Sequence, residues 1–81
     1  MSLNQNETNF IPKKIKPGND TIDFVVPLGV PFGPTFKITS VKQKVYYQGI
    51  DYTPLSGGQV QVFLHFYNEE ITDVDIEVGY A

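Results

Sequence analysis

Cysteine, tryptophan and arginine are absent from this chain of 81 residues, whose six basic residues are all lysines. Without cysteine the chain can form neither disulfides nor thiolate metal sites. Its one histidine also supplies too few ligands for a zinc site within one chain. We therefore expect no metal and no other cofactor. A domain this small often gains stability from partners instead.

The sequence also lacks the groups from which a catalytic site is built. Covalent and acid–base catalysis need an activated nucleophile or a base close to the reacting group. His65 is the single histidine, and the acidic pair Glu69-Glu70 has no nucleophile near it in sequence. We therefore predict a protein that is not an enzyme and has no catalytic residues.

The charge is small and unevenly distributed. The net charge is −3; residues 1–19 carry three lysines and one acid, and residues 20–81 carry three lysines and eight acids. Because nucleic-acid binding needs clustered lysine or arginine, we expect no nucleic-acid partner. No apolar run approaches the roughly 18 residues that span a membrane, and no signal peptide is visible, so we expect no membrane contact.

The N-terminal segment, residues 1–19, is polar and aperiodic and contains two prolines. We predict an extended arm, either disordered or laid against a partner, in front of a β domain of residues 20–81. Phe10, Ile11 and Ile15 are its large apolar residues after Leu3, and they are candidates for contacts with that partner.

Alternation of apolar and polar residues dominates the rest of the chain. The alternating segments are residues 21–28, 60–66 and 73–81. Successive side chains of a strand point to opposite faces, so this period of two predicts a sheet with one buried face. Between Ile38 and Val41 the apolar phase changes, which indicates two strands or one bent strand. We predict an all-β fold of five to seven strands, a small antiparallel sandwich or a partly open barrel.

Glycine and proline mark the expected connections. Residues 27–34 contain three prolines and two glycines, which predicts a rigid loop whose apolar side chains cap the core. Residues 48–58 are expected to be loop and turn, ending in a tight hairpin at the glycines. Residues 68–72 are expected to form the next turn. The structural turn residues are Gly49, Asp51 and Tyr52.

One face of the strand at residues 60–67 is aromatic. Phe63, His65 and Tyr67 alternate with apolar residues, and Tyr46 is expected nearby. This row has three interpretations: a contact between subunits, a second internal core face, or a platform for sugar stacking. A trimer would also gather three copies of His65 on an axis. The candidate interface residues are Phe10, Ile11, Ile15, Tyr46, Phe63, His65 and Tyr67.

Three carboxylates lie on one face of the last expected strand: Asp73, Asp75 and Glu77. Residues two apart on a strand are separated by about 7 Å, which is too far for one calcium ion without loop ligands. We interpret this face as a solvated, charged surface that discourages pairing of a strand edge with another chain.

The C-terminal part of the chain resembles bacteriophage virion proteins. The segments that carry the resemblance are Tyr46-Tyr47-Gln48-Gly49-Ile50-Asp51-Tyr52-Thr53, Ser56-Gly57-Gly58-Gln59-Val60 and Asp75-Ile76-Glu77-Val78-Gly79-Tyr80. In tail-fibre, baseplate and capsid-decoration modules a similar glycine–aspartate–tyrosine turn precedes a hairpin and a closing strand. The resemblance covers residues 45–81, under half of the chain. Pro54-Leu55 departs from the pattern, because it lengthens the loop before the hairpin.

The resemblance implies a non-enzymatic structural protein of a virion, either a capsid decoration or cement protein or a module that attaches a tail or fibre. Its partners would be other virion proteins or copies of itself in a homo-oligomer, with a trimer favoured. It would be made in the host cytoplasm and located in the virion. The alternative is a carbohydrate- or ligand-binding β module of an adhesin or accessory domain.

Overall fold

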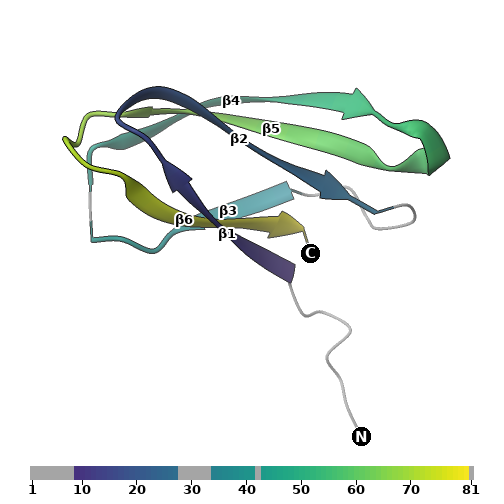
Figure 1. The fold of residues 1–81 in the computed structure, drawn as a ribbon, viewed down its shortest axis with the longest axis horizontal. Coiled ribbons are helices and arrows are strands. Elements are labelled where there is room, and N and C mark those ends of the chain that lie inside the picture. The colour runs from purple at the N-terminus through teal and green to yellow at the C-terminus, as the bar shows by residue number, and fades with distance from the viewer. Residues whose placement is uncertain (1–8, 28–33, 42, 81) are drawn as a thin grey trace, which may run out of the picture.

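The computed structural model describes residues 9–27, 34–41 and 43–80, and six strands within them form two three-stranded antiparallel sheets (Figure 1). One sheet has the order β1-β6-β3 and the other β2-β5-β4; we call them the β6 sheet and the β5 sheet after their central strands. The all-β prediction is confirmed, and the two separate sheets form a sandwich. The strands are β1 (Asn9–Ile15), β2 (Gly18–Val26), β3 (Pro34–Ile38), β4 (Val45–Pro54), β5 (Val60–Asn68) and β6 (Val74–Tyr80).

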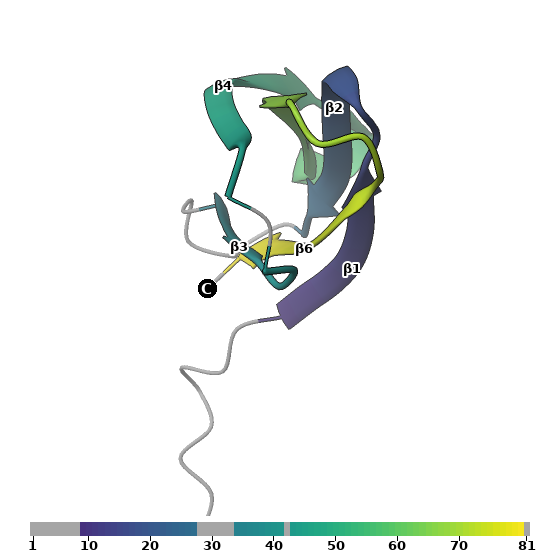
Figure 2. The ribbon, with the colours of Figure 1, turned by 90° about the vertical axis from the view of Figure 1, so that its left-hand side faces the viewer.

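The two sheets lie as layers, with β2 and β4 in one and β1, β3 and β6 in the other (Figure 2). β1 leads into β2 through the short corner at Lys16-Pro17, which carries the chain from one sheet to the other. β4 and β5 form a hairpin within one sheet, closed by the short helical turn η2 (Ser56–Gly58). In this turn the N–H of Leu55 donates to the carbonyl of Gln59 at 2.8 Å, as the predicted hairpin requires.

The hydrophobic core lies between the sheets and follows the period-two pattern of the central strands. Alternate residues of β5 and β6 point inward; Val60 and Tyr80 at the strand ends are partly buried, and the fully buried apolar ones are Val62, Leu64, Phe66, Val74, Ile76 and Val78. Phe66 of β5 packs edge-on against Phe36 of β3, with ring centroids 5.0 Å apart. Tyr47 of β4 lies 5.2 Å from Phe36, so three rings connect the two layers on the β3–β4 side.

The N-terminal boundary expected after residue 19 needs correction. Asn9–Ile15 is strand β1, paired along its whole length with β6, and β2 already begins at Gly18. Ile15 is 0% exposed and belongs to the core. The alternation of this segment is interrupted by Pro12 and two lysines, which an edge strand tolerates and which hid the period of two. The remainder of the expected arm, residues 1–8, lies outside the described part of the chain.

The expected turn at Gly49, Asp51 and Tyr52 is also wrong. These residues belong to β4, which runs unbroken from Val45 to Pro54 and pairs with β5. Gly49 has a φ of +137° at a shift in register after Tyr47, so it marks a β-bulge inside the strand. A glycine with positive φ fits a bulge as well as a turn, and only the pairing partner separates the two.

Other connections agree with the sequence analysis. The phase change after Ile38 separates two strands, β3 and β4, and these lie in different sheets. The described residues 69–73 join β5 to β6, where a turn was expected. Leu28, Val30 and Phe32, which were expected to cap the core, lie outside the described residues.

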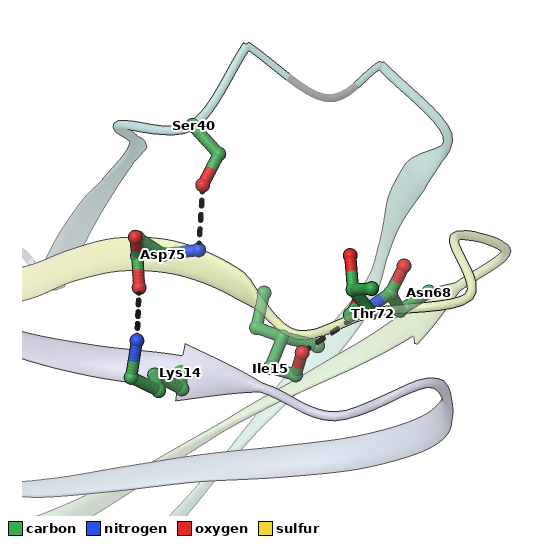
Figure 3. Close-up of polar contacts among 6 residues, drawn as sticks. All are labelled: Lys14, Ile15, Ser40, Asn68, Thr72 and Asp75. Carbon is green, nitrogen blue, oxygen red and sulfur yellow. Dashed lines mark hydrogen bonds and ion pairs between the residues drawn. The ribbon is translucent and has the colours of Figure 1, made fainter.

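One buried polar residue connects the end of β5 to the rest of the fold. Asn68 is 2% exposed, and its amide donates to the carbonyls of Ile15 at 3.0 Å and Thr72 at 3.1 Å (Figure 3). Its side-chain oxygen accepts from the N–H of Glu70 at 2.8 Å. A buried amide is stable only when its hydrogen bonds are made, so Asn68 fixes the β1–β2 corner and the β5–β6 turn together.

Candidate functional site

The outer face of the β5 sheet gathers most of the residues that the sequence singled out. The antiparallel register places each outward residue of β5 between one residue of β2 and one of β4. Four rows therefore cross this face. They are Asn19–Tyr67–Tyr46, Thr21–His65–Gly49, Asp23–Phe63–Asp51 and Val25–Gln61–Thr53.

A polar chain centred on His65 spans the three strands of this face. The Thr21 hydroxyl lies 2.9 Å from Nδ1 of His65, and Nε2 of His65 lies 2.7 Å from Oδ2 of Asp51. With its proton on Nε2, the ring donates to the Asp51 carboxylate and accepts from the Thr21 hydroxyl. These bonds fix the position of the ring between Thr21 of β2 and Asp51 of β4. When the imidazole is protonated, its contact with Asp51 is an ion pair.

Aromatic side chains lie on both sides of that polar chain. Tyr46 is 49% exposed, and its hydroxyl lies 3.5 Å from Oε1 of Glu69. Phe63 and Tyr67 are half-buried by their neighbours on the flanking strands. All three point away from the core. The interpretation of the row as a second internal core face is therefore wrong, because no layer of the described chain covers it.

A second polar contact orders the Phe63 end of the face. The Gln61 side-chain amide donates to Oδ2 of Asp23 at 2.9 Å. Asp51, on the other side of Phe63, keeps 74% of its side chain exposed despite its contact with His65. Two oriented carboxylates therefore flank one aromatic ring.

The outer face of the β6 sheet has a different character. Lys14 lies 2.7 Å from Asp75, and Lys37 lies 3.3 Å from Glu77 (Figure 3 shows the Lys14–Asp75 pair). The Lys37 ammonium also lies 4.6 Å from the ring centroid of Phe10. The hydrogen bond to Asp75, followed by the carboxylate charge, raises the pKa of Lys14 above its ordinary value of 10.5.

The carboxylates of β6 were expected to protect a strand edge, and this needs correction. β6 is the central strand of its sheet. Asp75 and Glu77 therefore lie between β1 and β3, where lysines of both neighbours pair with them. Asp73 precedes the strand. Sequence alternation placed these carboxylates on one face but could not show which strands flank them.

The seven candidate interface residues separate into two groups. Tyr46, Phe63, His65 and Tyr67 share the outer face of the β5 sheet. Phe10 and Ile11 lie on β1 in the other sheet and are partly exposed, on opposite faces of that strand. Ile15 is fully buried and cannot contact a partner.

Sequence reasoning missed the contribution of β2 to this site. Thr21, Asp23 and Val25 alternate with buried residues, which signals an outward face, and Val25 is 38% exposed. That these residues lie beside Phe63 and His65 depends on the pairing of β2 with β5, across more than thirty intervening residues. An open depression beside His65 is lined by Asn19, Asp20, Thr21, Gln48, His65 and Phe66.

No group of three histidine, cysteine or acidic side chains within residues 9–27, 34–41 and 43–80 is arranged to hold a metal ion. The same residues contain no helix long and apolar enough to cross a membrane. Comparison of the chain with protein-family models, with curated proteins and with solved structures gave no match.

Proposed function

We propose that this protein is a non-enzymatic structural module of a bacteriophage virion, which acts through protein–protein contacts made by the outer face of the β5 sheet. The single observation that carries the contact role is the difference between the two outer faces. One face is covered by lysine–carboxylate pairs, and the other presents Tyr46, Phe63 and Tyr67.

Partly exposed aromatic residues are typical of the centres of protein interfaces, because they bury a large area for little loss of side-chain entropy. The virion assignment is supported by the resemblance of residues 45–81 to phage modules. A capsid decoration protein or a tail attachment module would repeat one weak contact over many symmetric copies, which gives strong attachment through avidity.

The test is to purify particles from cells that carry this coding sequence and to quantify the chain in them by mass spectrometry. We expect a fixed copy number for each particle. Tyr46→Ala should reduce incorporation strongly, whereas Ile71→Ala, which removes an exposed apolar side chain elsewhere, should not. If the chain is folded in the cell extract but absent from particles, the virion assignment is wrong.

Carbohydrate binding is the second candidate, and the adjacent tyrosines favour it. Tyr46 and Tyr67 are directly opposite each other on neighbouring strands, with Asn19 in the same row. Flat aromatic surfaces with a nearby amide can stack on and hydrogen-bond to sugar rings. A glycan array decides this candidate: binding that disappears in Tyr67→Ala would support it, and the absence of any binding would refute it.

A further inference from the structure

Both outer faces of the sandwich contain an aromatic ring and carboxylates, but only one of them contains lysines that pair with those carboxylates. On the other face, Asp51 contacts His65 and Asp23 accepts from Gln61. On the β6 sheet, Lys37 lies over Phe10 and also pairs with Glu77, while Lys14 pairs with Asp75. Both lysines come from strands of that same sheet. On this face the lysines therefore neutralise the carboxylates of the same sheet.

The β5 sheet has no such lysines. Its strands β2, β4 and β5 are described along their whole length, and they contain Asp20, Asp23 and Asp51 but no lysine or arginine. The turn after β5 adds Glu69 and Glu70. Asp23 and Asp51, on the outer face that also presents the aromatic residues, therefore have no lysine of their own sheet to pair with.

The row Asp23–Phe63–Asp51 is the centre of this arrangement. Neighbouring strands are about 4.8 Å apart, so the two carboxyl-bearing positions lie on either side of the ring and about 10 Å from each other. A guanidinium or ammonium group within about 6 Å of an aromatic centroid is attracted by the ring face, and here both flanking carboxylates would add to that attraction. The Lys37–Phe10 contact shows the same type of interaction within this fold.

We infer that the outer face of the β5 sheet binds a basic, extended segment of another protein, with an arginine or lysine side chain placed over Phe63 between Asp23 and Asp51. This inference depends on the proposed function, since it names the chemistry of the partner. Alternate residues of an extended segment repeat every 7 Å or so, as do the outward positions Phe63, His65 and Tyr67 of β5. Basic side chains two residues apart in the bound segment therefore have the same spacing as the outward positions of β5.

A second copy of this chain is a poorer occupant. Two copies related by a two-fold axis would place the same face against itself, and its aspartates against aspartates. Like charges brought together in an interface oppose association. The opposite outer face offers little in exchange, because Lys14 and Lys37 are already paired within it.

The experiment measures binding of a synthetic ten-residue peptide of alternating arginine and threonine to the full chain, by calorimetry at low salt. The same peptide with glutamate in place of arginine is the ligand control. Asp23→Asn with Asp51→Asn removes two charges from the proposed site without changing side-chain size. Asp75→Asn with Glu77→Gln is the matched control, since it removes two charges from the other outer face. Circular dichroism verifies the fold of each variant.

We expect the arginine peptide to bind and the glutamate peptide not to bind. The Asp23/Asp51 variant should weaken binding at least about fivefold, whereas the Asp75/Glu77 variant should change it less than about twofold. Phe63→Leu, which keeps an apolar side chain but removes the ring, should also weaken binding several-fold.

Three results would overturn the inference. Equal weakening by both double variants would mean that only net charge matters. The absence of arginine-peptide binding to the wild-type chain would mean that the partner is not basic. Concentration-dependent self-association that is lost in the Asp23/Asp51 variant would identify a second copy as the occupant. If the peptide fails but incorporation into particles still depends on Tyr46, the proposed function stands and only the partner chemistry is wrong.

Discussion

Asn68→Ala should destabilise the fold more than any exposed substitution, because it removes three hydrogen bonds at one buried position. The side chain donates to the carbonyls of Ile15 and Thr72 and accepts from the N–H of Glu70. At a net value of about 1 kcal/mol for each bond, the loss is about 3 kcal/mol. A domain of this length is stable by about 4–12 kcal/mol, so the loss is a large part of the total.

The assay is urea unfolding followed by far-ultraviolet circular dichroism, since the chain contains no tryptophan. The unfolding midpoint should fall by about 1–3 M while the slope m stays constant, because the fold and its buried surface are unchanged. Thr72→Ala is the control: only its backbone carbonyl takes part, so its stability should stay within about 0.5 kcal/mol of the wild type.

Asn68→Asp separates the two kinds of bond. Aspartate keeps the oxygen that accepts from Glu70 but loses both donated bonds, and it places a carboxylate beside two carbonyl oxygens. It should be at least as destabilising as alanine at neutral pH. If Asn68→Ala stays within about 0.5 kcal/mol of the wild type, Asn68 does not hold the corner and the turn together.

Two further predictions concern the bulge and the outer ion pair. Gly49→Ala should cost about 1–3 kcal/mol of folding stability. The cost comes from backbone strain at φ +137°, because an added Cβ meets no atom within 4 Å. Gln48→Ala is the control, and equal unfolding midpoints for the two variants would contradict the strain argument. Lys14→Met should lower the melting temperature slightly, and its difference from the wild type should be constant from about pH 6 to about pH 9. Because the pKa of Lys14 is raised in the folded state, its contribution to stability is complete below the unfolded pKa of 10.5 and is lost as the pH rises through the folded pKa. A calorimetric melting-temperature difference between Lys14→Met and the wild type that fades between about pH 6 and about pH 9 would refute the assignment.

Much of the candidate site follows from alternation along a single strand. The pattern around Phe63 and His65 places them on the face opposite Leu64, and the structure agrees. The residues that lie beside them on neighbouring strands could not be predicted from this pattern, because strand pairing is a long-range property. Asp23 and Asp51 flank Phe63 from β2 and β4, two strands that both precede β5 in the chain but lie on opposite sides of it in the sheet.

The local sequence was also misleading where one residue pattern is compatible with two backbone structures. Gly49 followed by Asp51 fits a turn, yet the pairing of β4 with β5 makes it a bulge in a strand. Pro12 and the lysines near it fit an arm, yet pairing with β6 makes an edge strand. In both places the local sequence permits two conformations, and a partner strand selects one.

The sequence by itself determined that this protein is an all-β domain without cysteine chemistry, since composition and a period of two are local properties that survive in any arrangement of strands. Only the tertiary structure decided that Asp23 and Asp51 share one outer face with Phe63 and the tyrosines, while lysine–carboxylate pairs cover the other. That division arises from the strand orders β1-β6-β3 and β2-β5-β4. These orders bury apolar side chains between the sheets, ten of them within the described residues, which no single segment can bury alone.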